Sequence, residues 1–149
     1  MKTTGIQIIF FNSKQEVLLL KRYSKSDWEF FSTNIIQSEG EYQAASRGSR
    51  LTLGLELNIE KLFSTRKYYQ FTMNHDNRGD VNLLTFLYTL NLREKIELNQ
   101  DDYSELVWVD KKNVVEFIKE KKLRQLLVDL QPIFRDYFEL QEREKAKSK

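Results

Sequence analysis

The sequence predicts an α+β domain in which a mixed β-sheet lies between a central helix and C-terminal helices. Two patterns carry this prediction. Apolar and aromatic runs typical of strands recur as far as residue 110, and a single helical pattern interrupts them near residues 42 to 53. From Asn113 onward the apolar residues recur at helical spacing instead. Strands on both sides of one helix, followed by further helices, are typical of layered α+β domains.

Length and composition limit the classes of protein that the chain can be. A chain of 149 residues with 40% hydrophobic content is long enough for one domain with a core of its own. The formal charge of +2 gives no case for nucleic acid as the main partner. The absence of cysteine excludes disulfides and thiolate metal sites, which fits a reducing compartment. No apolar run approaches the ~20 residues that span a bilayer, so we expect a cytoplasmic protein with no membrane partner.

The first half of the chain is expected to begin with a hairpin. Residues 4–11 (TGIQIIFF) and 16–23 (EVLLLKRY) are β-rich runs that a short polar turn joins, and the first reads as a strand and not as a secretory signal. Residues 28–36 (WEFFSTNII) follow as a strand and then a loop. The helical pattern of residues 42–53 comes next, and Gly54 is suited to end it because glycine readily adopts the left-handed conformation.

The second half of the chain is expected to add strands and then helices. Residues 58–73 and 80–92 are strand-like, and the turn-rich NHDNRGD between them predicts a loop. Residues 104–110 (SELVWVD) predict another short strand. The last stretch is helical in pattern, and Pro132 is expected to interrupt or restart the helix because proline lacks a backbone N–H.

We divide the chain at this proline. Residues 1–131 form the predicted domain, and residues 132–149 form a C-terminal helical extension that ends in a charged tail. The extension carries an apolar stripe made of Ile133, Phe134, Tyr137 and Phe138. This stripe either caps the domain or forms the seam of a homodimer.

The residues from Trp28 to Leu55 keep the order and spacing of a known hydrolase motif without a gap. The motif begins with a tryptophan and a turn, which fall on Trp28 and Phe31–Thr33. It continues with a Gly-Glu pair, two alanines, an arginine and a final pair of glycine and an apolar residue. These fall on Ser38 and Glu39, Ala44 and Ala45, Arg47, and Gly54 and Leu55. The run resembles the Nudix box, the motif of hydrolases that cut nucleoside diphosphates linked to another moiety. Outside the box, VLLLKR resembles the strand that precedes it, and DDYSELVWVD resembles a late segment in which many members have an acid six residues before a tryptophan.

The resemblance implies a fold, an activity and a metal. The fold is the α/β/α sandwich of the Nudix type, with the box helix on one side of the sheet. The activity is hydrolysis, in which glutamates on one helical face hold magnesium, and the metal neutralises the diphosphate and activates water. In this chain the positions of those three glutamates are taken by Gly48, Leu51 and Thr52.

These three residues cannot supply the same ligands. Magnesium prefers charged oxygens, whereas glycine, leucine and threonine offer at most one neutral hydroxyl. Of the matched carboxylates only Glu39 remains, which makes it the one candidate metal ligand of the box. We therefore predict no cofactor and no tightly bound divalent cation at the helix. Magnesium is expected only if the protein is a hydrolase with a rearranged site.

The helix instead carries a stripe suited to packing. Ala44, Gly48, Leu51 and Leu55 follow the spacing of one helical face. We interpret this face as buried in the core or in an interface. The alternative is that its small residues lie directly beneath a bound ligand. Gly48 costs about 1 kcal/mol against alanine inside a helix, so we expect it to allow the close approach of another element or of a ligand ring.

Other side chains are candidates for binding a ligand, each with a structural alternative. Arg47 and the nearby Arg50 are candidates for binding a phosphate group. The alternative is that Arg47 forms an ion pair with an acidic side chain of the fold and that Arg50 is solvated. Trp28 and Tyr103 either stack on a flat ring or pack in the core. Arg22 either meets an anionic ligand or is a solvated strand end.

Two further residues are candidates for catalysis or metal binding. Asp102 matches the late acid of the family and is either a general base or an ordinary loop residue. His75 is the only histidine, and its place in the predicted loop argues against a metal site there.

Two functions therefore remain open. The first is a Nudix-fold protein without hydrolase activity, which binds a nucleotide-like or otherwise phosphorylated small ligand, or a protein. The second is an active hydrolase whose metal site is rebuilt from Glu39, Glu41, Glu56 or Asp102. Glu41 and Glu56 do not match the ligand positions of the family, and Glu56 lies past the glycine that ends the helix. We prefer the first function on coordination chemistry.

Overall fold

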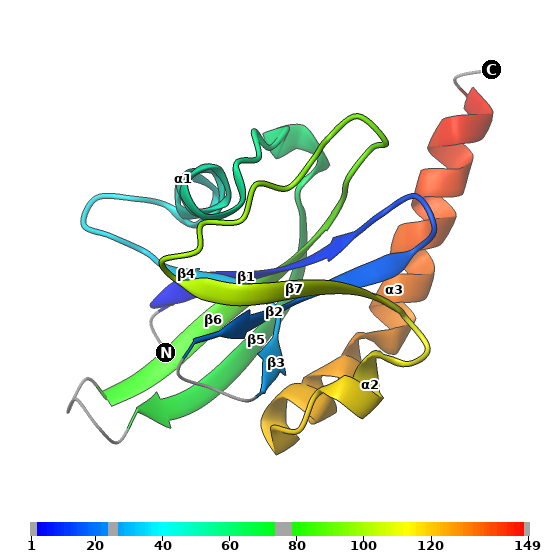
Figure 1. Cartoon of the computed structure of the whole chain (residues 1–149). Coiled ribbons are helices and arrows are strands. Elements are labelled where there is room, and N and C mark those ends of the chain that lie inside the picture. The colour runs from blue at the N-terminus through cyan, green and yellow to red at the C-terminus, as the bar shows by residue number, and fades with distance from the viewer. Residues whose placement is uncertain (1–2, 24–26, 74–78, 148–149) are drawn as a thin grey trace.

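The computed structural model describes residues 3–23, 27–73 and 79–147. Within these ranges the chain folds as one mixed β-sheet with helices on both faces, as the sequence predicts (Figure 1). The strands are β1 (Gly5–Phe11), β2 (Glu16–Arg22), β3 (Trp28–Glu29), β4 (Phe31–Asn34), β5 (Phe63–Met73), β6 (Gly79–Thr89) and β7 (Tyr103–Asp110). The helices are α1 (Glu41–Leu53), α2 (Val114–Phe117) and α3 (Lys121–Lys147), with a 3-10 turn at Ile59–Lys61.

Strand β1 is the centre of the sheet. It pairs in parallel with β6 along its whole length, and antiparallel with β4 over its first half and with β2 at Phe11. Strand β5 adds to the outer edge of β6, and β7 pairs antiparallel with β2. The β1–β2 connection is the predicted hairpin, and the side chain of Asn12 accepts a hydrogen bond from the backbone N–H of Glu16 at 2.9 Å.

Two apolar cores lie on opposite faces of this sheet because side chains alternate along β1. Ile6, Ile8 and Phe10 join the core under α1, whereas Ile9 and Phe11 join the core under α3. All of these side chains are buried, which explains why β1 is apolar on both faces. Figure 1 shows the resulting layers, with α1 above the sheet and α2 and α3 on its other side.

Helix α1 ends where the sequence predicts and begins one residue earlier, at Glu41. The backbone N–H of Gly40 donates to Oε1 of Gln43 at 2.7 Å, which closes the first turn. Gly54 ends the helix in the left-handed conformation with φ 66°, and its N–H bonds to the carbonyl of Arg50 at 3.1 Å. The helix thus presents residues 44, 45, 48, 49 and 53 to the sheet.

Two local predictions were wrong. Residues 58–62 do not begin a strand; the side chain of Asn58 caps the 3-10 turn there by accepting from the N–H of Glu60 at 3.1 Å. Pro132 does not interrupt the last helix, because α3 continues through it to Lys147. Leu130 and Phe134 on either side of the proline are both buried in the core, and this packing outweighs the one backbone hydrogen bond that proline removes.

Candidate functional site

A polar cavity of about 250 Å³ lies where the end of β2, the strand β4, the helix α1 and the start of β7 meet. It is lined by Arg22, Ser32, Thr33, Asn34, Thr52, Asp102 and Tyr103. Arg22 therefore comes together with Asp102 and Tyr103, which the sequence also singled out and which lie about 80 residues further along the chain. The lining is almost entirely polar, so the cavity suits a ligand that forms hydrogen bonds.

Arg22 provides the positive charge of this cavity. Its Nε donates to Oε1 of Glu29 at 2.6 Å and its Nη2 to the hydroxyl of Tyr103 at 3.0 Å. Its guanidinium also lies 4.6 Å from the centre of the Tyr103 ring. Burial opposes the charge of Arg22, but the neighbouring Tyr103 and Glu29 outweigh it and raise the pKa of the guanidinium. Arg22 is thus held in one orientation, and the two bonds use only part of its five N–H groups.

Tyr103 forms the wall against which Arg22 rests. The side chain is 1% exposed, and its burial raises its pKa to about 12. The phenol therefore stays protonated at neutral pH. It accepts a hydrogen bond from Arg22 and keeps its own proton for donation. Tyr103 belongs to the core under α1, which fits both the packing and the ligand-binding alternatives that the sequence left open.

Glu39 and Arg47 form a two-bond ion pair beside the cavity. Arg47 Nε lies 2.7 Å from Glu39 Oε2, and Arg47 Nη2 donates to Glu39 Oε1 at 3.0 Å and to the carbonyl of Asn34 at 2.6 Å. The hydrogen bond from Arg47 lowers the pKa of Glu39, and the same bond raises the pKa of Arg47. Both oxygens of Glu39 are therefore occupied by Arg47. Arg50, in contrast, is exposed.

Gly48 is buried against β4. A Cβ atom at this position would lie 2.7 Å from Thr33 Cγ2, 3.0 Å from Thr33 Cβ and 3.0 Å from Phe31 Cζ. These distances are too short for any side chain unless the side chain of Thr33 or Phe31 moves. The close approach of another element therefore accounts for the glycine, which is one of the two alternatives predicted.

The predicted apolar stripe of α1 is only partly buried. Ala44 and Leu55 are buried as expected, but Leu51 is 59% exposed. The prediction was wrong for Leu51 because the helix rolls toward its other flank, where Ser49 is fully buried. Leu51 lies about 60° around the helix from Gly48, which places it on the open flank. Thr52 is half-buried and lines the cavity.

Trp28 lies outside this cavity. It packs against the core under α3, and Lys21 Nζ lies 5.5 Å from the centre of its ring. The cavity also contains Asn34, which the sequence analysis did not single out. The only signal for it was the polar run Ser32–Asn34 after two phenylalanines. His75 falls outside the described residues.

The acidic residues do not converge. Asp102 and Glu56 are exposed and Glu41 is half-buried. Among the residues that the structure describes, no three His, Cys, Asp or Glu side chains gather closely enough to hold a metal ion. Within the same ranges no helix is both long and apolar enough to cross a membrane.

Comparisons with known proteins give the family. The model of the NUDIX domain matches residues 1–130. The dihydroneopterin triphosphate pyrophosphohydrolase of E. coli is similar in structure, with a TM-score of 0.69 and 17% identity over 85% of this chain and 95% of its own. The Ap4A hydrolase of C. elegans has a TM-score of 0.72 and 16% identity over 91% and 99%. The MutT protein of Methanosarcina mazei has a TM-score of 0.60 and 17% identity over 97% and 98%. At such identities the likeness shows the fold alone, and no curated protein matches the sequence.

Proposed function

Because the chain belongs to the NUDIX domain family, we propose that it binds a nucleotide-like or otherwise phosphorylated small ligand in the polar cavity, without hydrolysing it. The observation that carries this proposal is that a cavity suited to an anion lies next to a helix that lacks the metal ligands of the family. The cavity has a fixed cation and several hydroxyl groups, whereas the neighbouring helix has Gly48, Leu51 and Thr52 where the family has glutamates.

The cavity supports a ligand with an anionic group. Arg22 is fixed by Glu29 and Tyr103 and keeps N–H groups that neither of them uses. The hydroxyls of Ser32, Thr33 and Thr52 add donors around it. A fixed guanidinium with neutral donors is a common arrangement for phosphate. The volume of about 250 Å³ suits a phosphoryl group and a small part of the ligand, so the remainder would lie outside the opening.

The side chains of α1 beside the cavity support the absence of hydrolase activity, because they do not provide the ligands that a divalent cation needs. Gly48 has no side chain and is packed on β4, and Leu51 is apolar. Both oxygens of Glu39 already accept hydrogen bonds from Arg47. A magnesium ion would therefore have to break this ion pair to gain a single carboxylate, whereas such ions need several oxygen ligands.

An active hydrolase is the second candidate. Family membership favours it, since two of the similar structures are named as hydrolases of phosphorylated nucleotides or pterins. Asp102 lies in the cavity and would be available as a base. In this alternative, magnesium would bind a site rebuilt from Glu39, Glu41, Glu56 or Asp102.

We place this function in the cytoplasm, which the chain's lack of cysteine supports. The partner would be the small ligand, with no nucleic acid involved. A protein partner, including a second copy of the chain, is a separate proposal, and the oligomeric state in solution tests it.

A titration calorimetry screen with nucleoside diphosphates and triphosphates, with and without magnesium, tests the proposal. We expect saturable binding that does not need magnesium. Arg22→Lys keeps the charge but loses the fixed fork, and should weaken binding about tenfold. Arg50→Ala, on the exposed side of α1, is the matched control and should leave the affinity unchanged.

Product analysis on the same compounds separates the two candidates. The proposal expects no magnesium-dependent hydrolysis of these compounds above background, whether the product is phosphate, pyrophosphate or a nucleoside monophosphate. Magnesium-dependent hydrolysis that Glu39→Gln or Asp102→Asn abolishes would replace it with the hydrolase. If no compound binds under either condition, the ligand part of the proposal is wrong.

A further inference from the structure

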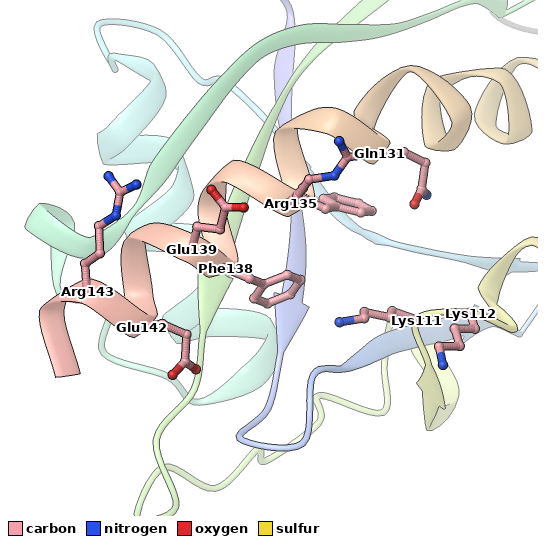
Figure 2. A pocket seen from close by; sticks show the side chains of 9 residues that line it. Lys111, Lys112, Gln131, Arg135, Phe138, Glu139, Glu142 and Arg143 are labelled. Carbon is pink, nitrogen blue, oxygen red and sulfur yellow. The ribbon is translucent and has the colours of Figure 1, made fainter. Parts of the chain in front are cut away.

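A second cavity, of about 550 Å³, lies on the other face of the sheet. It opens between the C-terminal half of α3 and the turn that follows β7. Figure 2 shows Lys111 and Lys112 on one side of it and Arg135, Phe138 and Glu139 of α3 on the other. Its lining shares no residue with the polar cavity described above. Neither the family nor the proposed function accounts for it.

The floor of this second cavity is aromatic and rigid. Phe134 and Phe138 are more than nine-tenths buried, and their inner sides pack on Phe11 with ring centres 5.5 Å and 4.8 Å away. Lys111 Nζ lies 4.6 Å from the centre of the Phe138 ring, and the same ammonium group donates to Oε1 of Gln15 in the β1–β2 hairpin. Lys111 is thus held over an aromatic surface by two contacts.

The rim of the cavity carries more positive than negative charge. Its lining includes four cations, Lys111, Lys112, Arg135 and Arg143, and two carboxylates, Glu139 and Glu142, and Lys145 Nζ lies 3.8 Å from Glu142 Oε1. Among the described residues, neither Lys112 nor Arg135 has an acidic side chain within ion-pair distance. Two cations on opposite sides of an aromatic floor therefore have no salt-bridge partner in the described part of the chain, and an anion between them would provide one.

We propose that this second cavity binds a small amphipathic anion, one with a flat apolar body and a carboxylate, sulfonate or phosphate head. The body lies against Phe138 and the head lies between Lys112 and Arg135. The volume is in the range of small-molecule sites, which combine an apolar wall with a few charged groups. The site is independent of the polar cavity, so it stands or falls apart from the function proposed above.

Fluorescence titration with anilinonaphthalene sulfonate, a flat apolar anion, tests this proposal. We expect a single saturable site on the full-length protein. Phenylnaphthylamine, which is the same ring system without the sulfonate, should bind at least about tenfold more weakly because it lacks the charge-assisted hydrogen bonds. Raising the salt concentration should weaken the binding of the sulfonate and leave the binding of the neutral probe unchanged.

Charge reversal on both sides of the cavity, at Lys112 and Arg135, locates the site. Lys112→Glu with Arg135→Glu should weaken sulfonate binding by at least about tenfold, because two charge-assisted contacts become repulsive. Lys122→Glu with Arg124→Glu changes the net charge equally at exposed positions outside the cavity and should leave binding unchanged. Equal losses in both variants would show attraction to overall charge and would overturn the proposal. So would chemical-shift changes at Arg22 and Tyr103 instead of Lys111 and Phe138, or the absence of saturable binding.

Discussion

The carboxylate of Glu39 shows how a residue that matches a family ligand position serves structure in this chain. Three N–H donors reach it, two from Arg47 and one from the backbone of Ile36 at 3.0 Å. These bonds join the loop before α1 to the body of the helix. The side chain of Glu39 is 15% exposed and that of Arg47 22%, so the pair is largely shielded from water.

The pair should make stability depend on pH in the acid range. Because Arg47 lowers the pKa of Glu39 in the folded state, the stabilisation is complete above the usual glutamate pKa of about 4.3 and is lost as the pH falls through the lowered value. Glu39→Gln should lower the melting temperature at pH 7, and the difference from the wild type should shrink as the pH falls below about 4. Thermal unfolding across this range measures it. Glu56→Gln, at an exposed position, is the control; a constant difference at all pH values would contradict the assignment.

Gly48 offers a second test at the residue scale. Alanine favours the helix by about 1 kcal/mol over glycine, but its Cβ would meet Thr33 and Phe31 at 3.0 Å or less, and such overpacking costs about 1–3 kcal/mol. We therefore expect Gly48→Ala to lower the free energy of unfolding by about 1 kcal/mol. Adding Thr33→Ser removes the nearest atom, Thr33 Cγ2, and should recover part of the loss. Urea unfolding of both single variants and the double variant tests this, and a stabilising Gly48→Ala would contradict it.

At the scale of elements, α1 and α3 show what could be read from the sequence and what could not. The bounds of α1 were predictable because the helical period and Gly54 are local signals. The exposure of Leu51 was not, because it depends on how the helix rolls on β4, a contact set by Gly48. The continuation of α3 through Pro132 depends on the buried Leu130 and Phe134, which only the packed sheet supplies.

The candidate site was likewise only partly predictable from the sequence. Arg22, Asp102 and Tyr103 were recognisable as residue types, but their meeting in one cavity follows from the pairing of β2 with β7. The second cavity had no sequence signal, because Lys111 and Arg135 belong to different elements that only the fold brings together.

The role of α3 can be tested by truncation. The predicted boundary at residue 131 falls inside this helix, and Phe134, Tyr137 and Phe138 beyond it are buried under the sheet. Each buried aromatic is worth about 3–5 kcal/mol, so losing three would cost about as much as the whole stability of a typical domain, which is about 5–15 kcal/mol. A chain that ends after Gln131 should therefore be unfolded by circular dichroism. A chain that ends after Arg143 loses only exposed residues among those described and should unfold like the full-length protein. A folded short form would show that residues 1–131 are a domain on their own.

At the scale of the whole molecule, the two cores share one sheet. The alternating side chains of β1 reach both cores, and the parallel pairing of β1 with β6 joins segments that are 78 residues apart, as between Gln7 and Thr85. Loss of either core should remove one side of β1 from its packing and so weaken the other. We therefore expect the two faces to unfold together.

The two tryptophans allow this coupling to be measured. Trp28 packs on the core under α3 and Trp108 on the core under α1, so Trp108→Phe and Trp28→Phe each leave one fluorescent reporter of one face. In both backgrounds the urea midpoints should coincide with that from circular dichroism, apart from the shift that each substitution itself causes.

Leu130→Ala removes a fully buried side chain on the α3 side and should cost about 2–5 kcal/mol. Because the sheet is shared, this variant should lower the midpoint seen by Trp108 as much as the midpoint seen by Trp28. Val128→Ala, at an exposed position of the same helix, should move neither by much. A midpoint that falls for Trp28 while it stays fixed for Trp108 would show that the face carrying the polar cavity is stable without α3.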